Sequence, residues 1–348
     1  MSNIITRNPR TDELAKLHSI WYSSFHSRDG DEFFSFYHNP DLCIVAERDG
    51  EPVSMGYLLP VGNLHIDNTN PPIPCAMIYA VASLPEFRNL GFGTAVTEGL
   101  INTARAKGYP AVVLCPADEN LFSFYTMRTE MREWFYITEH TYPAPGEIHR
   151  TAPDKICPDV YTMPGNKGFD DYAAPLNIDP AEYAVLESID PISYTALREH
   201  LLKKIPHINL NTQALEYQNR LCGLFGGGLY MIKSSSGTGC AIIERQSGDT
   251  VWIKELLMPQ HSANPAMPAN KRVNEAGRRL HEIVSKVSSL YPAKEYILRL
   301  PALYSDITSN EPCIGKSTRK FAMLALPQNI TYAAPSGNTA PWYGLAFD

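Results

Sequence analysis

The first part of the chain alternates between two hydrophobic patterns, one with the period of a strand and one with the period of a helix. Leu14, Leu17 and Trp21 recur at three- and four-residue intervals, which is typical of an amphipathic helix. Asp49-Gly50, between two apolar runs, indicates a hairpin. We expect strands at 3–7, 42–47, 53–60, 77–84 and 111–115, and helices at 11–25, 31–37 and 91–107.

A similar order of elements returns after a stretch rich in proline and glycine. We expect strands at 183–188, 229–233, 239–245, 251–258, 296–300 and 321–326, and helices at 193–204, 213–222 and 273–290. Two junctions match between the halves, because Gly108-Tyr109-Pro110 and Leu290-Tyr291-Pro292 each precede an apolar strand. We interpret this as a diverged internal duplication.

The repeated order predicts an α/β fold in which helices flank a mixed sheet in two similar lobes. The predicted parts are a first lobe at 1–142, a linker at 143–180, a second lobe at 181–327 and a C-terminal tail at 328–348.

Charge and cysteine usage narrow the class of protein. The formal net charge is -7 at pH 7, so neither nucleic acid nor an anionic membrane is an expected partner. The 7 Cys include no Cys-x-x-Cys pair and the 10 His show no ligand spacing, so we expect no metal site. Scattered thiols, no secretory signal and no apolar run of about 20 residues predict a cytoplasmic protein.

A strand-to-helix turn at 84–94 has the features of a phosphate cradle. The helix opens with Gly91 and Gly93, which lack a Cβ, so an anion can approach the free N–H groups of the first turn. Arg88 adds a permanent charge with forked donors. The alternative is a tight turn with no ligand. A dinucleotide site is disfavoured, because Val96 stands where its third glycine belongs.

Two segments resemble the GNAT superfamily of N-acetyltransferases. The run 81–93, Val-Ala-Ser-Leu-Pro-Glu-Phe-Arg-Asn-Leu-Gly-Phe-Gly, is similar to the family's pyrophosphate-binding signature, Arg/Gln-x-x-Gly-x-Gly/Ala after a strand. The run 120–125, Asn-Leu-Phe-Ser-Phe-Tyr, resembles the family's Asn-x-x-Ala-x-x-Phe-Tyr with one residue fewer. The resemblance covers about residues 3–142 and implies tandem GNAT-like lobes, the second of them degenerate.

The resemblance also implies a ligand and residue roles. Acetyl-CoA would be the cosubstrate, and Tyr125 would be the general acid that protonates the departing thiolate. The alternative for Tyr125 is a packed aromatic side chain. The implied acetyl-CoA contacts are Val81, Ala82, Ser83, Arg88, Asn89, Leu90, Gly91, Phe92, Gly93, Thr94 and Asn120.

The chain departs from the family pattern at the general base. Members often carry a Glu on the strand before the cradle, but Tyr79 and Ala80 stand there. The family's Gly-Phe pair after the tyrosine is also missing at 126–130. The tail at 339–348 is rich in aromatic residues and ends in Asp348. Because the enhanced-intracellular-survival type of acetyltransferase uses its terminal carboxylate as base, we hypothesise that role for Asp348; the alternative is a tail that packs for stability alone.

The acceptor side and the second lobe leave further alternatives open. Aromatic side chains at 21–37 form either an acceptor wall or core, and Asp29, Asp31 and Glu32 suit a cationic amine or a solvated helix start. Prolines at 259–268 replace a second cradle, and Glu255 is either functional or part of a buried ion pair.

The expected function is transfer of an acetyl group from acetyl-CoA to a small-molecule or peptide amine, by direct attack of the neutral amine. The alternatives are a catalytically silent acyl-CoA-binding or interaction module and, less favoured, a nicotinamide-dependent oxidoreductase. The sequence does not distinguish a monomer from an oligomer.

Overall fold

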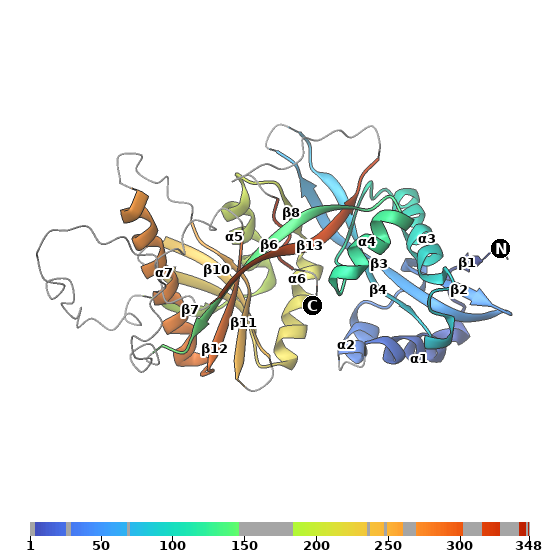
Figure 1. Ribbon diagram of the computed structural model, residues 1–348, viewed down its shortest axis with the longest axis horizontal. Coiled ribbons are helices and arrows are strands. Elements are labelled where there is room, and N and C mark those ends of the chain that lie inside the picture. The colour runs from blue at the N-terminus through green and yellow to red at the C-terminus, as the bar shows by residue number, and fades with distance from the viewer. Residues whose placement is uncertain are drawn as a thin grey trace, which may run out of the picture.

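The protein forms two lobes joined through a shared sheet. The computed structural model describes residues 4–25, 29–67, 70–145, 184–234, 237–246, 249–259, 269–301, 315–327, 341–345 and 347. Figure 1 shows an elongated molecule with the first lobe, blue to green, at one end and the second lobe, yellow to orange, at the other.

The first lobe contains four helices and six strands within the described residues. They are β1 (Ile5–Arg7), α1 (Leu14–Ser24), α2 (Asp29–Phe36), β2 (Cys43–Arg48), β3 (Glu51–His65), β4 (Ile73–Ser83), α3 (Phe92–Ala106), β5 (Ala111–Leu114), α4 (Glu119–Arg128) and β6 (Arg132–Pro143). The strands predicted at 53–60 and 77–84 are longer than expected, because β3 and β4 form an extended hairpin.

The second lobe and the end of the chain provide the remaining described elements. They are β7 (Val185–Ser188), α5 (Pro191–Leu202), β8 (His207–Leu210), α6 (Thr212–Leu224), β9 (Gly228–Ser234), β10 (Gly237–Arg245), β11 (Thr250–Leu257), α7 (Ala269–Leu290), β12 (Glu295–Leu300) and β13 (Gly315–Ala325).

Strand pairing confirms the mixed sheet and reveals how the lobes are joined. The described strands run in the order β1-β2-β3-β4-β5-β13-β6-β12-β11-β10-β9-β7, and β8 pairs with β3. The pairs β4–β5 and β11–β12 are parallel, one in each lobe. Strand β13 lies beside β5 and strand β6 lies beside β12, so each lobe completes its sheet with a strand from the other half of the chain. Figure 1 shows β6 and β13 crossing together between the lobes.

Helices cover both faces of this sheet. On one face α1, α2, α5, α6 and the C-terminal tail share a single hydrophobic core, which includes Leu17, Phe33, Tyr217 and Trp342. On the other face α3 and α4 cover the first lobe, and α7 covers the second. Because one hydrophobic core includes helices of both lobes, it packs the two lobes together on that face of the sheet.

Side-chain caps begin most of the longer helices whose starts are described. Asp118, Asp190 and Asn211 accept hydrogen bonds from first-turn amides of α4, α5 and α6, respectively. Helix α3 differs, because its N-cap is Gly91 and no described side chain caps it. The start of α3 therefore presents amide groups to whatever lies in front of it.

Candidate active site

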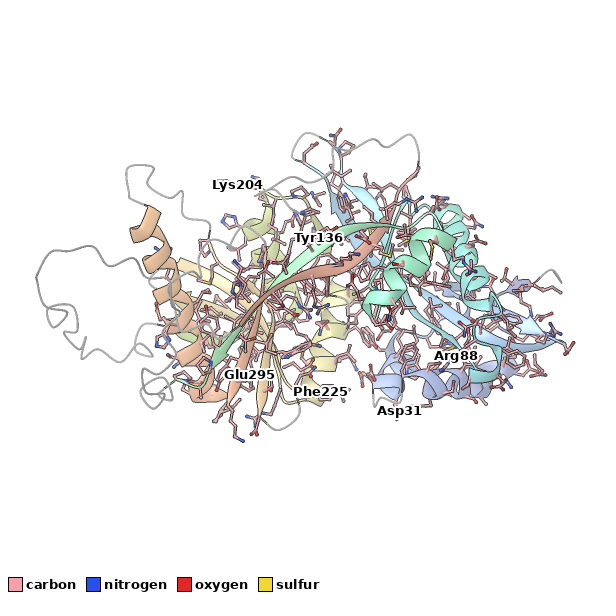
Figure 2. All side chains as sticks on the ribbon, in the orientation of Figure 1. Asp31, Arg88, Tyr136, Lys204, Phe225 and Glu295 are labelled. Carbon is pink, nitrogen blue, oxygen red and sulfur yellow. The ribbon has the colours of Figure 1, made fainter. Side chains whose placement is uncertain are left out.

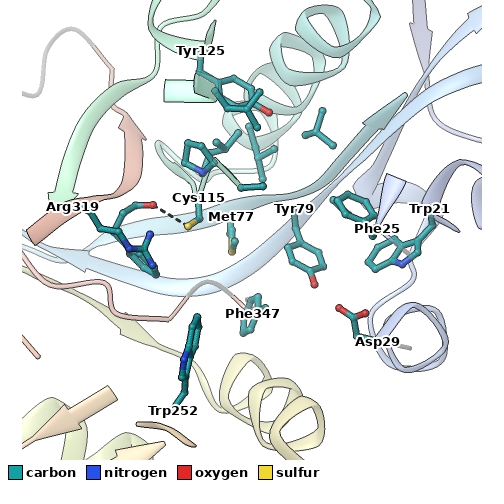
Figure 3. A pocket seen from close by; sticks show the side chains of 18 residues that line it. Trp21, Phe25, Asp29, Met77, Tyr79, Cys115, Tyr125, Trp252, Arg319 and Phe347 are labelled. Carbon is teal, nitrogen blue, oxygen red and sulfur yellow. Dashed lines mark hydrogen bonds between the residues drawn. The ribbon is translucent and has the colours of Figure 1, made fainter. Parts of the chain in front are cut away.

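A cavity of about 450 Å³ lies where the two lobes meet. Figure 3 shows Trp21, Asp29 and Tyr125 of the first lobe around it, together with Trp252 of the second lobe and Arg319 of β13. Phe347, near the end of the chain, also lines the cavity. Residues from the N-terminus, the middle and the C-terminus therefore meet at one place.

Strand β4 is bulged at the edge of this cavity. Its register with β3 pairs Tyr79 with Tyr57 and Ala82 with Met55, so Ala80 and Val81 stand together opposite Gly56. Ala80 has a φ of 53°, in the left-handed region that a non-glycine residue rarely adopts. A bulge leaves backbone groups unpaired, so this strand presents N–H and C=O groups to the cavity.

The start of α3 follows this strand after a turn that contains a short 3-10 helix, Pro85–Phe87. Gly91 has a φ of 91°, and the amide of Ala95 donates to the carbonyl of Gly91 at 3.1 Å. The amides of Phe92, Gly93 and Thr94 precede the first intrahelical bond and have no intrahelical acceptor. A Cβ built on Gly93 meets nothing within 4 Å, so no described atom crowds the first turn of α3 at this position. Together with the helix dipole these amides can bind an anion.

Arg88 lies in the turn before α3. Its guanidinium donates to the carbonyls of Ser83 and Ser23, both at 3.2 Å, so it ties the end of β4 to the end of α1. Figure 2 shows Arg88 in the first lobe, beside α1. The Arg88 side chain is exposed, so its remaining donors are accessible to a phosphate.

Other predicted cradle residues contribute in different ways. Leu90 is exposed, whereas the Phe92 ring is buried in the core, so only the backbone of Phe92 faces outward. Asn120 lies in the first turn of α4, where its amide donates to Asp118 Oδ1 at 2.9 Å. Of the predicted cosubstrate contacts only Val81 lines the cavity, whereas 88–94 form the turn and the start of α3, and Asn120 lies on α4.

Tyr125 stands on α4 and lines the cavity together with Val81 and Leu114. Burial raises the pKa of Tyr125 to about 12, the charge of Asp118 acts in the same direction, and a hydrogen bond with Thr97 opposes them. The hydroxyl therefore keeps its proton at neutral pH and can donate it across the cavity.

The acidic residues of α2 separate into different roles. Asp29 lines the cavity, and its Oδ1 atom is buried with no hydrogen-bond partner among the described residues. Asp31 is exposed and accepts from the Tyr22 hydroxyl, and Glu32 pairs with Arg220 at 2.9 Å. Only Asp29 therefore combines a place in the cavity with a buried oxygen that lacks a partner.

Aromatic rings surround Asp29 on its side of the cavity. Trp21 lies with its ring centroid 5.0 Å from that of Phe25 and 6.0 Å from that of Tyr79. Figure 3 shows these rings and the Asp29 carboxylate together. Phe33, from the same sequence cluster, is fully buried and belongs to the core. The aromatic residues at 21–37 therefore lie partly in the hydrophobic core and partly in the cavity wall.

The chain end reaches the same cavity. Phe347 packs against Tyr217 and Tyr79, at centroid distances of 5.2 and 5.9 Å. Asp348 lies outside the described residues, so its role as base stays a prediction. Tyr79 and Ala80 occupy the positions on β4 where the family resemblance implies a Glu base.

The second lobe keeps the bulge but fills it with ion pairs. Opposite the step from Ile242 to Ile243, Lys254 is the extra residue of β11. Its ammonium pairs with buried Glu244 at 2.8 Å, and Glu255 pairs with buried Arg198. Glu255 is therefore part of a buried ion pair. The proline-rich segment predicted to replace the cradle falls largely outside the described residues, at 260–268.

Two further observations concern other classes of function. No cluster of three His, Cys, Asp or Glu side chains that could hold a metal occurs in the described part of the chain. Among the described helices, none has the length and apolar character needed to cross a bilayer.

Comparison with known proteins identifies the first lobe. Residues 6–127 match the family model for an acetyltransferase (GNAT) domain. Over this range the first lobe is similar to GNAT acetyltransferase domains. This match covers the bulged strand, the head of α3 and Tyr125. A comparison with curated proteins found no match.

Solved structures extend the likeness of this GNAT domain to both lobes. A GCN5-related N-acetyltransferase from Kribbella flavida has a TM-score of 0.58 at 14% identity, over 92% of this chain and 70% of that one. A probable N-acyltransferase from Enterococcus faecalis gives 0.60 at 15%, over 93% and 72%. The N-myristoyltransferase of Saccharomyces cerevisiae, with bound myristoyl-CoA and inhibitors, gives 0.52 at 10%, over 99% and 87%. At these identities the likeness shows the fold alone, and that fold spans the tandem lobes.

Proposed function

We propose that the protein is an acyl-CoA-dependent N-acetyltransferase that moves an acetyl group from acetyl-CoA to the neutral amino group of a small molecule or peptide. The observation that carries this proposal is the uncapped start of α3, which follows a bulged strand at the cavity after one turn. Backbone donors for a pyrophosphate and backbone groups for a thioester then lie on consecutive segments. The GNAT domain at 6–127 and the acyltransferase neighbours support acyl transfer as the chemistry.

In this proposal different cradle residues bind different parts of the cosubstrate. The amides of 91–94 and the Arg88 guanidinium hold the pyrophosphate, with the backbone of 89 and 90 around it. The backbone of 81–83 aligns the pantetheine arm and the carbonyl of the thioester, and Asn120 contacts the cosubstrate from α4. Because N–H groups aimed at a developing oxyanion are preorganised, this strand lowers the barrier to attack.

The chemistry then needs one base and one acid. The neutral amine attacks the thioester carbonyl, the C–S bond breaks, and the amine nitrogen gives up one proton. The Tyr125 hydroxyl donates a proton to the departing thiolate, which leaves as CoA thiol. The base that takes the nitrogen proton is, in our hypothesis, the carboxylate of Asp348, the residue that follows Phe347 in the sequence; Phe347 itself lines the cavity.

The acceptor side of the cavity suits a positively charged group. Asp29 Oδ1 is a buried acceptor without a partner in the described residues, and such an atom is costly to leave unpaired. The rings of Trp21 and Tyr79 offer faces that attract a cation. A small-molecule or peptide amine whose cationic group lies beside Asp29 satisfies both features.

Release of free CoA from acetyl-CoA in the presence of an amine panel tests this function. We expect CoA release that depends on the amine and matches the amount of acetylated product, with cationic amines ahead of neutral ones. Longer acyl-CoA compounds, up to myristoyl-CoA, test the acyl group in the same assay. Binding of acetyl-CoA without CoA release with any amine would instead support the silent acyl-CoA-binding module.

A further inference from the structure

The C-terminal tail is seated in the interior of the molecule. Trp342, Tyr343 and Leu345 are fully buried and Phe347 is almost so. The backbone of Trp342 pairs with the start of β8, since its amide donates to Pro206 O at 2.8 Å and its carbonyl accepts from Ile208 at 3.2 Å. The tail is thus buried and joined to the start of β8 by two backbone hydrogen bonds.

A buried ion pair lies under this tail. Glu255 of β11 and Arg198 of α5 are both fully buried, with Arg198 Nε 2.9 and 3.1 Å from the two Glu255 oxygens. Tyr194 donates to Glu255 Oε1 at 3.0 Å. The indole Nε1 of Trp342 donates to Glu255 Oε2 at 2.6 Å. Glu255 therefore gathers donors from one helix and from the tail.

The other end of the tail lies at the cavity between the two lobes. The Tyr343 hydroxyl contacts Met77 Sδ at 3.1 Å, and Met77 lines the cavity together with Phe347. Gly344 lies between Tyr343 and Phe347 in the sequence. Its backbone crosses the Trp342 ring so closely that a Cβ on Gly344 would lie 2.1 Å from the indole. The place of the indole ring therefore sets the path of the residues that follow it.

An apolar seat would hold a tryptophan ring as tightly, because a buried ion pair gains little stability over well-packed hydrophobic groups. The ion pair instead fixes the orientation of the indole ring, because its single N–H must point at one carboxylate oxygen. We propose that Glu255 and Arg198 are positioning residues that lock Trp342 and so set where the chain end enters the cavity. The second lobe, whose bulged strand carries buried ion pairs, thus binds the tail.

This inference rests on the proposed acyl transfer for its kinetic consequence, but not for its structural one. Trp342→Phe removes the indole donor and leaves the pair of Glu255 with Arg198 intact. Gly344→Ala pushes the tail off the indole without altering Glu255. Tyr194→Phe is the matched control, because it removes one donor from the same carboxylate and does not touch the tail.

Hydrogen exchange of the C-terminal peptide and steady-state kinetics test the proposal together. We expect amide exchange in 341–348 to become at least about tenfold faster in Trp342→Phe and Gly344→Ala, and kcat to fall at least about tenfold, by analogy with the loss of one charge-assisted hydrogen bond. The KM for acetyl-CoA stays within about twofold of the wild type, and Tyr194→Phe stays close to wild type in all three measurements.

Two results would overturn the proposal. One is wild-type tail exchange and wild-type kcat in Trp342→Phe and Gly344→Ala; the other is an equal loss in Tyr194→Phe, which shows a general effect of stability. If the wild type transfers no acetyl group, the proposed function fails, and the exchange comparison alone still decides whether Glu255 seats the tail.

Discussion

At the scale of single residues, the chemistry depends on where burial leaves polar atoms without partners. Asp29 and Asp31 stand in the same turn of α2 and look equivalent in sequence. The fold buries one oxygen of Asp29 in the cavity wall and leaves Asp31 in solvent with Tyr22. Sequence could predict acids at this helix start, but not which of them faces the acceptor.

Asp29→Asn tests the acceptor side. The variant keeps the shape and removes the charge, so we expect the KM for a cationic amine to rise about tenfold to a hundredfold, the range for a hydrogen bond to a charged group. The KM for acetyl-CoA should not change. Asp31→Asn is the control and should behave as the wild type. Equal KM values for the amine in both variants would remove Asp29 from the acceptor site.

Tyr125→Phe tests the acid. Loss of general acid assistance lowers kcat by about 10²–10⁴-fold, while acetyl-CoA binding persists. Since a tyrosine acts as an acid only below its own pKa, which burial raises to about 12, the Tyr125-dependent part of kcat should persist to about pH 11. Tyr109→Phe, outside the cavity, is the control. A Tyr125→Phe variant with wild-type kcat would leave Tyr125 as a packed aromatic.

At the scale of elements, local sequence patterns predicted the helices and strands whose packing partners are close to them in the sequence. Helix α3 and strand β5 follow one another and were expected close to their observed ends. Strand β6 was not expected, because its partners β12 and β13 come from the far end of the chain, as in the pairing of His140 with Leu298 and Lys316. The strand predicted at 321–326 begins earlier, at Gly315, for the same reason. Strand β8 is only four residues long and pairs with β3 of the other lobe.

The junction of β8 with the tail predicts acid sensitivity. Burial lowers the pKa of His207 to about 3, and the nearby charge of Arg198 acts in the same direction. The unfolded chain therefore binds a proton below about pH 6.5 that the folded protein does not bind. Stability is present above that pH and is lost as pH falls toward the folded pKa, by up to about 1.4 kcal/mol per pH unit for one proton.

His207→Asn isolates this effect. Asparagine keeps a donor for Ile205 O, which accepts from His207 Nδ1 at 2.8 Å, and does not titrate. Chemical denaturation between pH 6.5 and 4 should show a smaller loss of unfolding free energy in the variant than in the wild type. Parallel pH profiles for the two proteins would show that His207 does not carry the dependence.

At the scale of the whole molecule, the two lobes are similar in plan and differ in use. Each has a parallel strand pair and a bulged strand, and each borrows a strand from the other half of the chain. In the first lobe the bulge faces a cavity, whereas in the second it holds the ion pairs of Lys254 and Glu255. The order of elements predicted the mixed sheet with flanking helices, and the internal duplication stays a prediction. The exchange of strands could not be predicted, because register between distant segments leaves no local pattern.

The account predicts a single acyl-CoA site, at the head of α3. Calorimetric titration with acetyl-CoA tests it most directly, in the wild type and in two glycine variants. Gly93→Val adds a branched side chain to the first turn of α3, and Gly93 has no positive φ that would strain a side chain, as Gly91 has. Gly223→Val in α6 is the control, since a Cβ there also meets nothing within 4 Å.

We expect one acetyl-CoA per chain in the wild type and in Gly223→Val, and no measurable binding in a folded Gly93→Val. A stoichiometry near two, or unchanged binding in Gly93→Val, would contradict the account.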